Sequence, residues 1–271
     1  LEDQPSIEWQ DFHPFMRDLR DPDSERLAAW AEGRTGVPFV DACMRALRAH
    51  GWINFRMRAM LQSVASYTLW LPWQATGSHL ANLFMDYEPG IHWSQVQMQS
   101  GVTGINSVRA YSVSKQSIDH DPDGDFIRQW VPELAAVPTE HIHEPWLMSK
   151  TEQEQYNCRI DIDYPAPIVD EKAARKEGIS KSYKAKGDAG VRRRAKIVFD
   201  IHGSRSRHLV PDPALWPLPP EHVEVREEEV EHAQAGQRVP PHGLLRWLLL
   251  THRAPGPAPG PGRQAPRAGF R

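Results

Sequence analysis

Two arginines, Arg56 and Arg58, carry the only formal charges between residues 51 and 85, a stretch otherwise rich in tryptophan, phenylalanine, methionine and leucine. A guanidinium group stays protonated in proteins, and burying it without a partner costs several kcal/mol. The first acidic residue downstream is Asp86. We therefore expect an inward-facing Arg58 to pair with Asp86, either as an ion pair that joins two helices or as the frame of a pocket for a polar ligand.

The stretch that carries these arginines is predicted to be helical over residues 52–70. It holds no proline and no internal glycine, and alanine, leucine and methionine are frequent. Residues two apart on a helix lie about 200° apart around its axis, so Arg56 and Arg58 face different ways, one outward and one inward. Polar residues break the apolar run and Pro72 follows it, which excludes a membrane span.

The whole chain is predicted to be all-α, because helix signals dominate and the alternation typical of strands is almost absent. With 40% hydrophobic residues in 271, it can build a sizeable core. Gly51 is expected to end one helix and Asp170 to cap the start of another. Besides 52–70, helices are expected over residues 24–33, 39–50, 77–86, 92–99, 124–131, 151–157, 170–184 and 189–202.

Cysteine usage and the N-terminus bound the class of protein. The two cysteines, Cys43 and Cys158, form neither a disulfide framework nor a metal motif, which favours a cytoplasmic protein without a metal site. His141 and His143 lack the converging ligands that a zinc site needs. No signal-peptide apolar region follows the N-terminus, and the chain opens without methionine, so we expect that it has lost its beginning.

Charge is strongly segregated along the chain. Residues 171–207 hold twelve Lys/Arg against four Asp/Glu, whereas the whole chain has a net charge of -3. This basic segment is interpreted either as a nucleic-acid surface or as the solvated face of two surface helices. Half of the 24 prolines fall in residues 211–271, so residues 204–271 are predicted to be a disordered tail after a helical domain at 1–203.

Several longer motifs resemble one known family. LAAWAEGRTGVPFVDACMRAL, GWINFRMRAM, the DYEPGIH region, DPDGDFIRQWVPEL, HEPW and DYPAPIVD follow one another across residues 24–185. In order and spacing they resemble the photolyase/cryptochrome family. The resemblance implies the all-helical catalytic portion of that family, with FAD as the cofactor and damaged DNA as the partner of a monomeric protein.

The resemblance also implies roles for individual residues. Those expected at the flavin are Trp52, Arg58, Asp86, Tyr87 and Glu88, and Trp73 matches the middle member of a tryptophan chain that carries electrons to it. DNA-facing positions are Arg56 and Arg109. Four departures from the family pattern are His92 near the flavin N5, Val96 for the innermost tryptophan, Met98 for the tryptophan that packs on the lesion, and Phe55 for an asparagine at the lesion rim.

These departures leave the activity open between related functions. The leading expectation is light-driven, FAD-dependent repair of a pyrimidine lesion in DNA, with Trp73 and His92 as the catalytic residues. The alternatives are a cryptochrome-like blue-light photoreceptor and an inactive truncated remnant. Trp70 and Trp93 are close enough in sequence to replace the missing tryptophan, although tryptophans at such spacings are more often core residues. A histidine at residue 92 is expected to titrate near its usual range of roughly 6–7, unless it is a core histidine bonded to a backbone carbonyl.

Overall fold

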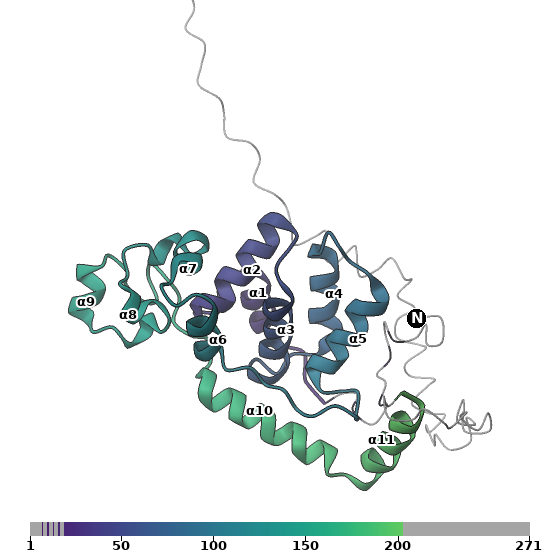
Figure 1. Ribbon diagram of the computed structural model, residues 1–271. Helices are drawn as coiled ribbons and strands as arrows, with labels where there is room; N and C mark the ends of the chain where they lie inside the picture. Colours follow the sequence, from purple (N-terminus) through teal and green to yellow (C-terminus); the bar gives the residue numbers. More distant parts are fainter. Residues whose placement is uncertain (1–6, 8–9, 11–12, 14–15, 17–18, 203–271) are drawn as a thin grey trace, which may run out of the picture. The chain divides into compact units, whose positions relative to one another are not determined.

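The computed structural model describes residues 19–202 and four positions before them, Ile7, Gln10, His13 and Met16. The predicted tail at 204–271 lies outside these residues. The described part is helical (Figure 1), and its one β-bridge joins Ile160 and Tyr164. None of its helices is long and apolar enough to cross a membrane.

Most of the helices follow one another with short connections, and the longer connections are 101–112 and 156–170. The longer ones are α1 (Ser24–Glu32), α2 (Pro38–His50), α3 (Phe55–Ser63), α4 (Trp73–Leu83), α5 (Pro89–Ser100), α6 (Val113–His120), α10 (Glu171–Lys186) and α11 (Ala189–His202). A π-helix, η3 (Val64–Thr68), continues α3 directly. Short elements complete the order: α7 (Asp125–Trp130), η4 (Pro132–Leu134), α8 (Thr139–Ile142), η5 (Pro145–Leu147) and α9 (Lys150–Gln155).

Helix ends follow the local chemistry, with several differences from the sequence prediction, among them α4, which spans Trp73–Leu83 instead of the expected 77–86. Gly51 ends α2 in the left-handed conformation at φ 68°, and Asp170 caps α10 by accepting a hydrogen bond from the amide of Ala173, both as predicted. However, α3 begins at Phe55 rather than at residue 52, because the Asn54 side chain caps its first turn. Helix α6, at 113–120, was not predicted.

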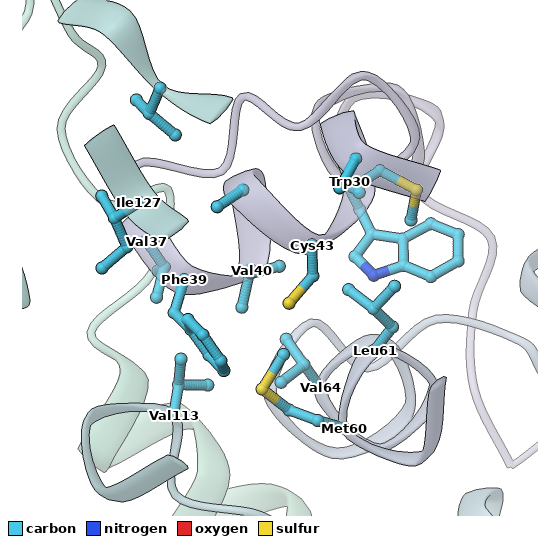
Figure 2. Packing of buried hydrophobic residues seen from close by; sticks show 14 of the residues in the cluster. Trp30, Val37, Phe39, Val40, Cys43, Met60, Leu61, Val64, Val113 and Ile127 are labelled. Carbon is cyan, nitrogen blue, oxygen red and sulfur yellow. The ribbon is translucent and has the colours of Figure 1, made fainter. Parts of the chain in front are cut away.

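The main core forms where α2 packs against α1, α3, α6 and α7 (Figure 2). Trp30 of α1, Cys43 of α2 and Leu61 of α3 are fully buried there, as is Ile127 of α7. The helical spacing of apolar residues in α2 puts one broad face of that helix against its neighbours. This core holds α3 rigidly, and α3 carries both arginines of the opening stretch.

The start of α2 is tied to a segment more than a hundred residues away. Asp41 is buried and accepts hydrogen bonds from the Thr35 amide and hydroxyl, the Gly36 amide and the Tyr164 hydroxyl. Burial raises the pKa of the Asp41 carboxyl, and the Thr35 and Tyr164 hydrogen bonds oppose that rise. The carboxylate thus joins the residue 35–41 turn to the chain before α10.

Helix α10 packs closely across η3. Its buried residues are Glu171, Gly178 and Ser182, which lie on one face. A Cβ atom added at Gly178 would lie 2.0 Å from the carbonyl oxygen of Tyr67, so only glycine permits this approach. The exposed side of α10 and α11 carries basic side chains: Lys172, Lys176, Lys181, Lys184, Arg192, Arg193 and Lys196.

Candidate functional site: a cavity between α3, α4 and α5

A cavity of about 170 Å³ lies between α3, α4 and α5. Residues three, four and seven apart on α3 and on α5 share a face of their helix, and these two faces form much of its wall. The lining residues are Phe55, Arg58, Ala59 and Gln62 of α3, Leu80 of α4, Phe84, Asp86, Tyr87 and Glu88 of the connection, and Ile91, His92, Gln95, Val96 and Gln99 of α5.

Arg58 and Asp86 form the predicted ion pair. The Arg58 Nη2 donates to the Asp86 Oδ2 at 2.9 Å, and its Nε donates to the Ile53 carbonyl at 2.7 Å. The guanidinium carbon also lies 4.2 Å from the centre of the Phe84 ring. The hydrogen bond from Arg58 holds the pKa of Asp86 below its ordinary value.

The ion pair differs from the sequence expectation in its burial. The Arg58 side chain is 24% exposed and that of Asp86 is 51% exposed. The pair therefore does not sit in the interior as expected, because Asp86 lies on the connection between α4 and α5 rather than on a packed helix face. As predicted, Arg56 faces elsewhere and is exposed.

His92 lies on the wall of the cavity and is 8% exposed. Its Nε2 lies 2.9 Å from the Gly77 carbonyl oxygen. A Cβ atom at Gly77 would come within 2.7 Å of the Trp93 ring, so the glycine permits the contact between α4 and α5. Burial lowers the pKa of His92; the hydrogen bond to Gly77 opposes this shift and the charge of Arg58 adds to it.

This environment bears on the expected titration of His92. The expected range of roughly 6–7 is that of a solvated histidine, and desolvation shifts the pKa of His92 downward from its ordinary value. The alternative of a core histidine on a backbone carbonyl describes its hydrogen bond correctly. His92 is therefore both a buried histidine next to a backbone carbonyl and a residue of the cavity wall.

A row of aromatic side chains leads from the cavity wall into a second cluster of buried hydrophobic residues, which includes Trp73, Trp93 and Val96. Trp93 packs edge to face on His92 with ring centroids 4.8 Å apart, and its Nε1 donates to the Tyr87 hydroxyl at 2.9 Å. On its other side Trp93 packs against Trp73 at 5.9 Å and 71°. Trp73 and Trp93 are both buried. Trp93 therefore joins Trp73 to the cavity.

Trp70, the other tryptophan considered from sequence, has a different environment. It has a positive φ of 57°, and the Arg20 guanidinium and the Lys181 ammonium lie 4.7 and 5.2 Å from its ring centre. It contributes nothing to the cavity wall. Two cations beside an indole make it harder to oxidise, because they destabilise a positive charge on the ring.

Tyr87 and Glu88 line the cavity, whereas two other predicted residues do not. Glu88 also caps α5, its carboxylate accepting from the Ile91 amide at 2.6 Å. Trp52, which was expected to line the cavity, is 56% exposed and lies outside the lining. It precedes the Asn54 cap and so is not part of α3, whose residues line the cavity. Met98 is half-buried and also lies outside the lining, although it follows the lining residues Ile91 and Gln95 by seven and three positions on α5.

The two residues expected to meet DNA lie at different elements. Phe55 is 62% exposed and lines the cavity, and the neighbouring Arg56 is exposed at the start of α3. Arg109 is exposed on a loop whose backbone is held by the Ser63 hydroxyl, which donates to the Arg109 carbonyl at 3.1 Å. The ammonium of Lys186 on α10 donates to the Asn106 carbonyl of the same loop.

Sequence reasoning missed three glutamines of the cavity wall, Gln62, Gln95 and Gln99. Their spacing from the predicted site residues could have identified them. Gln62 follows Arg58 by four residues, and Gln95 and Gln99 follow Glu88 by seven and eleven. Such intervals repeat one face of a helix. Among the described residues, no group of three or more histidine, cysteine, aspartate or glutamate side chains could hold a metal ion.

The cavity has the chemistry that a flavin ring requires. Aromatic side chains and leucine offer flat apolar contacts to such a ring, and the described contacts of Arg58 use two of its five N–H groups. Buried side-chain oxygens of Gln62, Gln95 and Gln99 lack a hydrogen-bond partner within the described chain. These unsatisfied acceptors, in a mostly apolar cavity, are typical of a small-molecule site. The residues present therefore fit the expected cofactor.

Comparison with known proteins agrees with this chemistry. The family described as "FAD binding domain of DNA photolyase" matches residues 1–184. A deoxyribodipyrimidine photo-lyase of Alkalihalophilus pseudofirmus is 38% identical over 160 residues, which is 58% of this chain and 33% of the relative. A cryptochrome DASH of Gloeobacter violaceus is 36% identical over 160 residues, or 58% and 32% of the two chains.

Solved structures give the same result. The crystal structure of a bacterial class III photolyase from Agrobacterium tumefaciens superposes with a TM-score of 0.63 at 27% identity, covering 68% of this chain and 39% of that one. The chain thus spans about a third of the length of the curated relatives named above. It belongs to the photolyase/cryptochrome family and consists largely of that family's FAD-binding helical domain.

Proposed function

We propose that this chain is the flavin-binding part of a light-driven DNA-repair protein that acts on a pyrimidine lesion. The observation that carries the proposal is that the ion pair of Arg58 and Asp86 lines the cavity together with the exposed Phe55. The exposed Arg56 follows Phe55 in the first turn of α3. A repair site must contact a base that has been flipped out of the DNA helix, and an apolar rim can pack against that base. It must also bind the phosphate backbone, and an exposed arginine can do so. When bound and reduced, FAD supplies the light-excited electron donor.

Different residues of the cavity are proposed to contact different parts of the cofactor. Arg58 and Asp86 position polar groups through a fixed ion pair, and Tyr87 and Glu88 form the turn beside them. His92 offers its ring next to Tyr87 and stays neutral at neutral pH, because burial lowers its pKa. In this proposal a neutral His92 adds no positive charge to the cavity and can exchange a proton only under acidic conditions.

Trp73 and Trp93 are proposed to carry electrons to the cavity. Trp93 contacts both Trp73 and the cavity residues His92 and Tyr87, so it can act in place of the tryptophan that the family pattern places at Val96. Edge-to-face indoles in contact give a short path for electron transfer through buried, apolar surroundings. This role of Trp93 differs from the expectation that its spacing marks a core residue, although it is buried in the core as well.

The DNA-facing surface is proposed to include Arg56, Arg109 and the basic side of α10 and α11. Lys186 links α10 to the loop that carries Arg109, so the two basic regions are neighbours in the fold. A surface with several exposed lysine and arginine side chains binds the phosphates of DNA independently of the base sequence. We propose that residues 1–203 form this helical domain and that it works as a monomer.

A cryptochrome-like photoreceptor is the second candidate, and Met98 favours it. Family repair proteins are expected to pack a tryptophan on the lesion at this position, whereas the half-buried Met98 is not an indole and lies outside the cavity lining. A protein that signals through a partner keeps the flavin site and the tryptophans but needs no lesion pocket. Both candidates therefore share the cavity and differ only at its rim.

Blue-light repair of a defined lesion separates the candidates. The protein, loaded with FAD and reduced, is mixed with an oligonucleotide carrying a cyclobutane dimer or a 6-4 product and illuminated. Restoration of the bases, measured chromatographically, with loss of activity in Arg56→Ala, supports repair. If blue light changes the redox state of the bound FAD but the bases of neither lesion are restored, the result supports the photoreceptor.

A further inference from the structure

The side-chain oxygens of Gln62, Gln95 and Gln99 are buried around one cavity without a hydrogen-bond partner in the described part of the chain. Gln62 is 2% and Gln99 is 4% exposed. Leaving a buried acceptor unsatisfied costs about 1–3 kcal/mol. Three such acceptors on one small cavity indicate that a bound molecule supplies the donors.

A network of hydroxyl groups determines which way the Gln62 amide points. Its Nε2 lies 3.1, 2.9 and 3.0 Å from the hydroxyl oxygens of Ser66, Thr76 and Ser100. Each hydroxyl already donates its hydrogen elsewhere: Ser66 donates to Ser100, and Ser100 and Thr76 donate to backbone carbonyls. The three oxygens can therefore only accept. The NH₂ group must face them, and the carbonyl oxygen of Gln62 must face away from the network.

Gln95 and Gln99 extend this acceptor surface along α5. They lie one helical turn apart, on the face that also carries His92, and all three line the cavity. The ring of His92 is held at the Gly77 carbonyl. Gln62 on α3 and the two glutamines on α5 thus bring acceptors from two helices to one cavity.

We propose that Gln62, Gln95 and Gln99 form an acceptor surface for N–H groups on the ring edge of the bound flavin and so favour its reduced form. The inference rests on the flavin site of the proposed function. An oxidised flavin ring has a single N–H, and reduction adds N–H groups to its edge. Acceptors therefore gain partners on reduction, which stabilises the reduced form relative to the oxidised one.

The test compares the affinity of the full chain for oxidised FAD and for FAD reduced with dithionite, both measured without oxygen by equilibrium ultrafiltration. The variants are Gln99→Met and Gln95→Met, which keep the length of the side chain and remove the acceptor. Gln95 is only partly buried, so Gln95→Met is expected to disturb folding less than Gln99→Met. The test can therefore be made with Gln95→Met if Gln99→Met does not fold. Gln116→Met on α6, outside the cavity lining, is the matched control.

Each cavity variant is expected to weaken binding of reduced FAD about tenfold more than binding of oxidised FAD, which corresponds to about 30 mV for a two-electron couple. The control is expected to leave both affinities unchanged. Equal losses in the two redox states, or no loss in either, would overturn the inference and leave the flavin site standing. Failure of the unaltered chain to bind FAD in both states would overturn the flavin site and the inference together.

Discussion

The guanidinium of Arg58 on α3 and the carboxylate of Asp86 after α4 lie 2.9 Å apart at the mouth of the cavity. The pair spans 28 residues of sequence and fixes the connection before α5 against α3. Because Arg58 also stacks on Phe84 and bonds to the Ile53 carbonyl, its position is set from three sides. One side chain in the lining of the cavity that is expected to receive the flavin thus connects three other residues.

Replacing Arg58 with methionine is expected to lower FAD affinity about tenfold, because a hydrogen bond to a charged group contributes roughly 1.5–3 kcal/mol. Fluorescence titration of the purified chain measures the loss. Arg34→Met, which breaks the exposed pair between Arg34 and Glu32, is the matched control. Equal affinities for the Arg58 and Arg34 variants would leave Arg58 with a structural role only.

The stability of the chain is expected to fall on acidification through His92. Its pKa is lowered in the folded protein, so the unfolded chain binds more protons below about pH 6.5. The stabilising contribution is therefore present above that pH and is lost as pH falls through the folded pKa. His92→Asn should reduce the difference in urea midpoint between pH 7 and pH 5. His13, whose pKa burial also lowers, provides the comparison.

The same substitution tests the role of His92 toward the flavin. In the unaltered protein, photoreduction of FAD is expected to change with pH at a midpoint lower than that of a solvated histidine, since desolvation lowers the pKa of His92. In His92→Asn that step should be absent. Identical pH profiles for the two proteins, recorded as light-induced absorbance changes, would limit His92 to packing and to its hydrogen bond with Gly77.

Trp73→Phe and Trp93→Phe are each expected to slow photoreduction of bound FAD at least tenfold, since phenylalanine is much harder to oxidise than tryptophan. The measurement is the rate of flavin bleaching under constant blue light. Trp130→Phe, in the separate contact with His50 and Phe126, is the control. Retention of the full rate in Trp93→Phe would exclude it from the electron path.

DNA binding is expected to be electrostatic. Arg56→Ala and Arg109→Ala should each lower the slope of log affinity against log salt by about one unit, because each removes one phosphate contact. Filter binding across a range of salt concentrations measures the slope. Arg159→Ala, which removes an exposed arginine paired with Asp163, should leave it unchanged. An unaltered slope in the first two variants would show that this surface is misassigned.

Gly178→Ala is expected to destabilise the fold by about 1–3 kcal/mol, as overpacking does, although alanine favours helices by about 1 kcal/mol. The added methyl would meet the Tyr67 carbonyl oxygen at 2.0 Å. Gly190→Ala on α11, where the nearest atom belongs to the Asp188 side chain, is the control. Urea unfolding measures both variants, and equal midpoints would contradict the close packing of α10 on η3.

The sequence by itself determined the helical class, most helix positions and the Arg58–Asp86 pair. The first two follow from local chemistry, since apolar periodicity and caps such as Asp170 act over a few residues. The pair was predicted because an isolated arginine in an apolar stretch needs a partner, and Asp86 is the first acid downstream. Tertiary structure decided how the faces of α3 and α5 meet. It placed Trp52 outside the cavity, brought Gln62, Gln95 and Gln99 onto its wall, and put Trp93 against Trp73. Those contacts depend on the packing of whole helices, including the close approach at Gly77, which no local pattern encodes.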